Sequence, residues 1–239
     1  MAEPADPAAH LVWNKDQRTP ARRAPSVDRI VRTAIGIADA DGLAAVSMRR
    51  VATDLGSGTA SLYRYVASRD DLLDLMIDTV HGETEPPRPS GDGRADLAAI
   101  AGHLRDTLLR HPWLGPELAG RPALGPNSLR RHDIALAAAS ELTSDITLAA
   151  NIVDAVTAYV LGAAGQELAE MQAQRRSGLS EQQWREAVGP YLRGVIAEGA
   201  YPHFARRVID ARDSSAAERF AFGLDCVLDG IAAQTARPR

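Results

Sequence analysis

The sequence contains a single cysteine, Cys226, a single lysine, Lys15, and few aromatic residues. One cysteine cannot form a disulfide within the chain and fits a reducing compartment, so we expect a cytoplasmic protein. Cys226 falls in an apolar helical pattern, which predicts a thiol that fills the core. No stretch approaches the roughly 18–20 uninterrupted apolar residues of a membrane span, and no apolar secretory signal opens the chain. We therefore expect no membrane partner.

Motifs of common enzymes and metal sites are also absent. The chain has no G-x-S-x-G, no H-E-x-x-H, no C-x-x-C and no phosphate-binding loop that ends in Gly-Lys-Ser/Thr. Gly56 and Gly58 mimic the beginning of a dinucleotide-binding fingerprint, but no predicted strand precedes them. The six histidines lack metal-ligand spacing. We predict a protein that is not an enzyme, with no metal site and no cofactor.

Charge is distributed unevenly along the chain. The net charge is −4, yet the segment from Lys15 to Arg69 holds ten basic residues against five aspartates. A basic end on an acidic body is expected of a module that docks on phosphates, and also of a surface whose charge is merely uneven. Residues 1–25 have no apolar period and are expected to be a disordered basic arm. That arm either contacts DNA or serves as a solubilising tail.

The stretch 47–71 reads as two short helices followed by the start of a third. Ser47 is a suitable N-cap for the first helix, and Gly56-Ser57-Gly58 ends it, because glycine reaches a positive φ without a Cβ clash. A second helix is predicted over Thr59–Val66, with Leu62 facing inward. A glycine turn between two helices, the second with exposed hydroxyls, aromatic rings and an arginine, is typical of a helix-turn-helix.

Neighbouring helices complete this unit. Ser26 is predicted to cap a helix that carries an apolar stripe and ends at Asp41-Gly42. The residues 68–71 are close to a capping box for a further helix that ends near Gly82. The segment 86–93 is rich in proline and glycine, so we place a domain boundary there.

The rest of the chain shows helical periods and no convincing strand, which predicts an all-α fold. Residues 112–126 are expected to be loop-rich, and no helix is expected between a turn at 199–202 and a last helix from Ser214 or Ser215. The other expected helices span 97–109, 128–142, 145–175 and 180–196. The long helices after Asp145 and Ser215 carry more apolar surface than one small domain needs, which favours either a dimer interface or a monomer core.

These features resemble the tetracycline-repressor (TetR) family of transcriptional regulators. The resemblance rests on the sequences AIGIADADG, SMRRVA, SLYRYV and Leu72-Leu73 within Val27–Val80, and extends more weakly to the ligand-binding half. It implies an N-terminal three-helix helix-turn-helix DNA-binding domain over 26–82, plus a helical ligand-binding and dimerisation domain over 94–239. The implied function is a ligand-responsive repressor that binds a palindromic operator as a homodimer and is released by a small-molecule inducer.

Candidate DNA contacts follow from side-chain chemistry and from this resemblance. Hydroxyl groups and a guanidinium can hydrogen-bond base edges, and an alanine can touch a thymine methyl group. The tyrosines suit phosphates or sugars, although either ring can instead belong to the core. Two further arginines match positions that contact DNA in the family. The predicted DNA-binding residues are Arg49, Thr59, Ala60, Ser61, Tyr63, Arg64, Tyr65 and Arg69.

A pocket for the effector is expected between helices of the second domain. Its candidates are polar side chains stranded among apolar ones, each of which can also be a satisfied structural group. His111 matches a histidine that helps bind magnesium–tetracycline in the tetracycline repressor, whereas Gln166 replaces an acidic residue of that site, which argues against a magnesium chelate. The predicted ligand-binding residues are His103, Thr107, His111, Trp113, Asn151, Asp154, Thr157 and Gln166.

Alternatives from other classes stay open at this point. A helical small-molecule-binding protein without DNA regulation would share the second domain, and a helical enzyme would use the same pocket for catalysis. A transcriptional activator is also compatible, because a helix-turn-helix does not encode the sign of regulation.

Overall fold

The computed structural model describes residues 12–14, 26–120 and 123–236. The described residues contain helices and no strand, which confirms the predicted all-α class. The helices are η2 (Val12–Asn14), α1 (Val27–Asp41), η3 (Leu43–Ala45), α2 (Met48–Asp54), α3 (Thr59–Leu62), α4 (Arg69–His81), α5 (Gly93–Arg110), α6 (Leu114–Leu118), α7 (Pro126–Ser140), α8 (Ile146–Ser177), α9 (Glu181–Ala197), α10 (Pro202–Asp210) and α11 (Ala216–Thr235).

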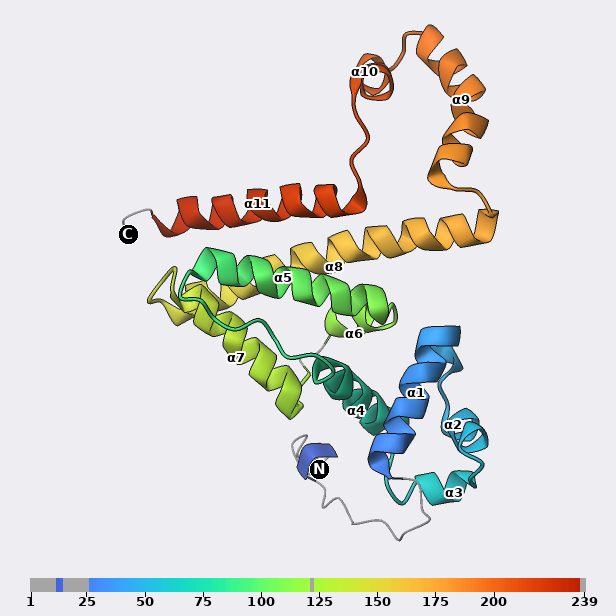
Figure 1. Ribbon diagram of the computed structural model, residues 1–239, viewed down its shortest axis with the longest axis vertical. Helices are drawn as coiled ribbons and strands as arrows, with labels where there is room; N and C mark the ends of the chain where they lie inside the picture. The colour runs from blue at the N-terminus through green and yellow to red at the C-terminus, as the bar shows by residue number, and fades with distance from the viewer. Residues whose placement is uncertain (1–11, 15–25, 121–122, 237–239) are drawn as a thin grey trace, which may run out of the picture.

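Helices α1 to α4 form a small unit, which we call the head (residues 26–82; Figure 1). Ser26 caps α1 by accepting a hydrogen bond from the Arg29 backbone N–H at 3.2 Å, as predicted. The apolar stripe of α1 is buried, and Ile30 is among the side chains with no exposure. Leu62 and Val66 are buried in the same core. The head is thus built around α1, with α2 and α3 on one side and α4 on the other.

Helices α5, α7 and α8 pack on one another, and α11 lies along α8; with α6 they form what we call the body (Figure 1). Its core includes Leu97 and Leu108 of α5 together with Leu228 of α11. Close packing depends on Gly93, since a Cβ there would lie 2.5 Å from the backbone oxygen of Ala138. Of the body's helices, α7 packs against α4 of the head.

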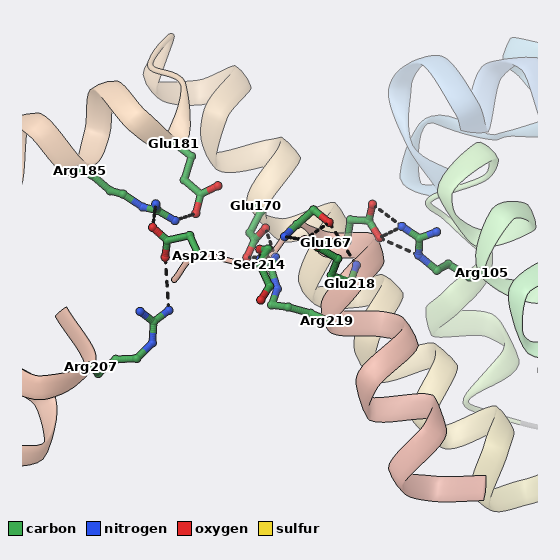
Figure 2. A network of polar contacts seen from close by, with 11 residues as sticks. Arg105, Glu167, Glu170, Glu181, Arg185, Arg207, Asp213, Ser214, Glu218 and Arg219 are labelled. Carbon is green, nitrogen blue, oxygen red and sulfur yellow. Dashed lines mark hydrogen bonds and ion pairs between the residues drawn. The ribbon is translucent and has the colours of Figure 1, made fainter. Parts of the chain in front are cut away.

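The segment 178–213 leaves the body as an arm that carries α9 and α10 (Figure 1). Neither helix contains a buried residue. At the base of the arm, Asp213 contacts Arg185 of α9 and pairs with Arg207 of α10 at 3.5 Å (Figure 2). Large apolar side chains stay exposed on it, namely Leu179, Trp184, Tyr191, Tyr201, Phe204, Val208 and Ile209.

Three local expectations were wrong. The loop-rich passage 112–126 contains the five-residue helix α6, which is too short to show a helical period. No helix was predicted after Pro202, yet α10 begins there with proline in the first turn, where its missing N–H is not needed. Cys226 is exposed, because it stands two positions from both Leu224 and Leu228 and so lies on the other side of α11.

Helix α8 is long and apolar enough, by length and composition alone, to cross a membrane, with a mean hydropathy of 1.6 over its most apolar window. Asn151, Asp154 and Thr157 interrupt its apolar residues. One such helix is weak evidence for a membrane span, because helices that pack in soluble proteins meet the same criterion. Only 28% of that window is buried within this chain, so much of an apolar helix is left uncovered.

Candidate functional site

The predicted helix-turn-helix consists of α2 and α3. The Ser47 hydroxyl accepts a hydrogen bond from the Arg50 backbone N–H at 3.2 Å and caps α2. Gly56 has φ +64° in the turn that follows, a conformation that glycine adopts without strain. The α-helical part of α3 ends at Leu62, earlier than the predicted Val66, and the chain continues as a turn held by hydrogen bonds to the Leu62 carbonyl.

The outer side of α3 presents several of the predicted DNA contacts to solvent. Tyr63 is 51% exposed, and Arg64 is exposed with its guanidinium donating to the Ser61 hydroxyl at 3.1 Å. Ala60 is exposed as well, whereas Thr59 and Ser61 are half-buried. Tyr65 is half-buried against the core, so a packing role applies to this ring more than to Tyr63.

The remaining predicted DNA contacts, Arg49 and Arg69, differ in the partners that their guanidinium groups have within the chain. Arg49 is exposed and forms no ion pair with a described carboxylate. Arg69 is turned toward the backbone, where its guanidinium donates to the carbonyls of Val46 at 3.4 Å and Leu43 at 3.3 Å. A guanidinium bound in this way supports the turn before α2.

A hydrogen-bonded cluster around the buried His111 joins the head to the body at the end of α5. The His111 side chain is only 5% exposed; its Nδ1 lies 2.8 Å from Oδ1 of Asp39 on α1, and its Nε2 lies 2.9 Å from Oε2 of Glu83 after α4. The Trp113 indole N–H donates to the same Asp39 oxygen at 2.8 Å. We call Asp39, Glu83, His111 and Trp113 the clasp. In this structure both predicted ligand residues of the clasp are engaged within the chain.

A second buried cluster joins α4 to α7. Asp78 accepts hydrogen bonds from the Ser128 backbone N–H at 2.9 Å, the Ser128 hydroxyl at 3.1 Å and the Asn127 amide at 2.9 Å. Because the serine proton is directed at Asp78, Nδ1 of His81, 2.8 Å from that hydroxyl, acts as the donor. Burial, followed by the nearby Arg131, lowers the pKa of His81 to about 4. The cluster therefore holds a neutral histidine at neutral pH.

Arg131 on α7 lies between these clusters without a described carboxylate as ion-pair partner. Its Nε donates to the His81 carbonyl at 2.8 Å, and its terminal nitrogen contacts Nε2 of His103. Burial, followed by Arg110, lowers the pKa of the Arg131 guanidinium, and burial, followed by Arg131, lowers that of His103. The Thr84 hydroxyl lies 3.1 Å from the same His103 nitrogen.

The predicted ligand-binding residues do not converge on one cavity. Thr107 is buried and donates to the His103 carbonyl at 2.9 Å. On α8, Asn151 and Asp154 are exposed and Thr157 is half-buried. Gln166 lines a cavity of about 360 Å³ between α8 and α11, together with Tyr159, Glu167, Arg219 and Phe220. These eight residues occupy at least three separate places in the body.

Ion pairs hold the walls of this outer cavity (Figure 2). Arg105 of α5 forms a forked pair with Glu167 of α8, with nitrogen–oxygen distances of 2.8 to 3.0 Å. The same guanidinium lies 5.1 Å above the Phe220 ring. Arg219 pairs with Glu170 at 2.9 Å. These contacts fix α11 against α8 and α5.

A second cavity, of about 660 Å³, lies where head and body meet, and we call it the junction cavity. Its wall comes from α1, α4, α5, α7 and the segment after α4. The lining residues are Arg32, Thr79, Gly82, Glu83, Thr84, Arg110 and Asn127. None of them was among the predicted ligand contacts, although Thr84 bonds to His103 and Glu83 bonds to His111.

Sequence reasoning missed Asp39, Glu83 and Arg131. Asp39 lies on the polar side of an amphipathic helix, where an aspartate is ordinary, and Glu83 sits in a connecting segment. Their partners are distant along the chain, since the bond between His111 and Asp39 spans 72 positions. No local spacing signals such a contact.

Comparison with known proteins places the chain in a family. Residues 85–235 match the family model described as "Tetracyclin repressor-like, C-terminal domain". The chain is 39% identical over 235 residues to the HTH-type transcriptional repressor DrrR1 of Streptomyces coeruleorubidus, covering 96% of this chain and 86% of that protein. It is 38% identical over 212 residues to an HTH-type transcriptional regulator of Saccharopolyspora erythraea, covering 83% and 88% respectively.

A solved structure agrees with these sequence matches. The TetR family protein ActR of Streptomyces coelicolor, in complex with actinorhodin, superposes with a TM-score of 0.72 at 30% identity, covering 92% of this chain and 100% of that chain. The resemblance inferred from the helix-turn-helix is thereby confirmed, and the chain belongs to the TetR family of transcriptional regulators.

Proposed function

We propose that this protein is a cytoplasmic transcriptional repressor that binds a palindromic operator as a homodimer and releases it when a small molecule binds the body. The observation that carries the proposal is the geometry of α3, where buried Leu62 and Val66 hold Tyr63 and Arg64 outward. Relatives named as repressors support the sign of regulation, and the ActR complex with actinorhodin supports a small-molecule effector.

We propose that the head and the body have separate binding functions. Residues 26–82 would bind DNA, and residues 94–239 would bind the effector and the second subunit. The predicted N-terminal arm, residues 1–25, lies outside the described residues apart from 12–14, where Val12 is buried and η2 lies against α4. We propose that α3 enters the major groove, where Arg64 and the hydroxyls of Thr59 and Ser61 reach base edges.

The uncovered sides of α8 and α11 support a second copy as the partner. Phe222 is 74% exposed on α11, on the same side as the exposed Cys226. On α8, Ala155, Ala158 and Gly162 offer a surface of small side chains that allows close approach of another helix. An apolar helix pair that stays largely uncovered is expected to associate, and a two-fold arrangement places two copies of α3 on one operator.

The effector site is proposed in the body, where the predicted residues remain candidates. His103, Thr107, His111 and Trp113 lie at the end of the body that faces the head, whereas Gln166 lies in the outer cavity. A ligand at the first position touches groups that also bond to α1 and to the segment after α4. Differential affinity for two head orientations would then convert ligand binding into DNA release.

An electrophoretic mobility-shift titration on DNA upstream of the protein's own gene tests the proposal. The double variant Tyr63→Ala/Arg64→Ala is expected to lose at least tenfold in affinity, because it removes a base contact and a phosphate contact. Arg193→Ala on the arm is the matched control, since it removes one exposed arginine far from α3. Equal affinity of wild type and double variant, or a monomer in sedimentation, would refute the proposal.

A further inference from the structure

The junction cavity is built from both parts of the molecule, and this sets it apart from the outer cavity. Arg32 belongs to α1 and Thr79 to α4 of the head, whereas Arg110 belongs to α5 and Asn127 to α7 of the body. A molecule in this cavity contacts elements that move relative to each other whenever the head changes orientation. Its affinity must therefore depend on that orientation.

The side chains that line the cavity include two guanidinium groups, Arg32 and Arg110, and one carboxylate, Glu83. Arg110 reaches Glu83 at 3.6 Å only, and the same Glu83 oxygen lies 2.9 Å from Nε2 of His111. Arg131 lies behind the cavity wall, where it contacts His103, and His103 in turn bonds to Thr84 of the wall. Arg131 has no described carboxylate as ion-pair partner. Of Arg110 and Arg131, only Arg110 has a described carboxylate partner, and that carboxylate, Glu83, already bonds to His111 in the clasp.

Arg32 adds a third guanidinium from the head. It pairs with Asp28 of its own helix at 2.8 Å, and both side chains of this pair are largely exposed. An exposed pair at this spacing contributes little stability, so exchange of its carboxylate for that of a ligand costs little. Burial, followed by repulsion from Arg110, lowers the pKa of Arg131, and a bound anion would relieve the repulsion.

We propose that the junction cavity binds the carboxylate group of an organic acid, with Arg110 as the principal partner and Arg32 as a second contact from the head. Arginine suits this role because its planar fork donates two parallel hydrogen bonds to a carboxylate. The inference rests on the proposed function and specifies the chemical class of its effector. Because the acid bridges α1 and α5, its binding and operator binding are coupled, and each changes the affinity of the other by the same factor.

Calorimetric titration of the full-length protein at low salt provides the test, with phthalate as the probe and phthalamide as its neutral counterpart. Phthalate is expected to bind at least tenfold more tightly than phthalamide, since charge-assisted hydrogen bonds are the stronger ones. Arg110→Gln is expected to lower phthalate affinity at least tenfold, and Arg32→Gln severalfold. Arg130→Gln, which breaks only an exposed pair with Glu85, is the control and is expected to leave affinity unchanged.

Each part of this experiment has a result that would contradict the proposal. Equal binding of phthalate and phthalamide, no binding of phthalate, or an unchanged affinity in Arg110→Gln would overturn the carboxylate site. If Arg110→Gln does not fold by circular dichroism, Arg32→Gln decides, because its exposed side chain is not needed for folding. Operator binding without phthalate is measured separately, so that loss of the carboxylate site is distinguished from failure of the repressor proposal.

Discussion

At the scale of single residues, the contact between α4 and α7 leaves no room at Gly125. A Cβ at this position would lie 2.2 Å from a carboxylate oxygen of Asp78. That carboxylate cannot move aside cheaply, since Ser128 and Asn127 hold both of its oxygens. The same close approach is what allows α7 to begin beside the end of α4.

Gly125→Ala is therefore expected to destabilise the protein by roughly 1–3 kcal/mol, the usual cost of overpacking a filled site. Urea unfolding followed by circular dichroism measures the change. Gly102→Ala on α5 serves as the control, because a Cβ there meets nothing within 4 Å and alanine favours a helix. A Gly125→Ala protein as stable as wild type would show that Asp78 is not held as tightly as its hydrogen bonds imply.

His81 makes the free energy of unfolding depend on pH. The sign of this dependence follows because the folded protein holds the histidine in its neutral form. The unfolded chain takes up a proton near pH 6.5, whereas the folded protein does so near pH 4. Below pH 6.5 the unfolded state thus binds more protons, and stability is lost as the pH falls from about 6.5 to about 4. The expected loss is on the order of 3 kcal/mol, since each pKa unit corresponds to about 1.4 kcal/mol.

Unfolding titrations between pH 4 and 7 on wild type and His81→Gln check this expectation. Carboxylates and other histidines contribute to both proteins, so the difference between the two curves isolates His81. The variant is expected to show a flatter curve over this window. Parallel curves would mean that His81 titrates near its ordinary pKa.

At the scale of elements, the clasp is what attaches α1 to the end of α5. Asp39→Asn removes the charge that accepts from both His111 and Trp113, and hydrogen bonds to charged groups contribute about 1.5–3 kcal/mol. We expect a loss of this size in unfolding free energy and faster amide hydrogen exchange in α1. Asp54→Asn, which breaks an exposed pair with Arg50 in the same head, should cost less than about 1 kcal/mol.

A double-mutant cycle of Asp39→Asn with Trp113→Phe measures the interaction energy between these two side chains, apart from their other contacts. Phenylalanine keeps an aromatic ring and removes only the indole donor. Because the two residues share a hydrogen bond, their effects should be clearly non-additive. Additive effects would place the stabilising contribution of Trp113 in packing alone.

At the scale of the whole molecule, the uncovered side of α11 sets the expected assembly. Phe222→Glu introduces a charge where a dimer interface would exclude water, so the dimer is expected to dissociate. Sedimentation velocity should show a monomer, with operator affinity reduced because each subunit then binds one half-site alone. Leu129→Glu is the control, since that side chain is half exposed and belongs to the first turn of α7 rather than to α8 or α11. Unchanged sedimentation of Phe222→Glu would contradict this interface.

Local patterns were sufficient for most of the fold. Ser26, Ser47 and Ser68 each cap the helix predicted after them, and the apolar stripe of α1 is buried as its spacing indicates. Such signals are readable because caps and helical faces involve residues three or four positions apart. The glycine turn before α3 and the SLYRYV sequence after it were also enough to indicate a TetR-like head.

The arrangement of the polar groups between head and body had no such local signal. His111 was predicted to face a ligand, and in the structure its two nitrogens bond to Asp39 of α1 and to Glu83 just after α4, two residues that the fold brings beside the end of α5. The junction cavity and the contacts of Arg131 with His81 and His103 arise from the packing of distant segments in the same way. The sequence by itself thus determines where the helices form and that the head is a DNA-binding unit, because these features depend on residues a few positions apart. The polar contacts between head and body are decided only by the tertiary structure, because they join segments far apart in the chain.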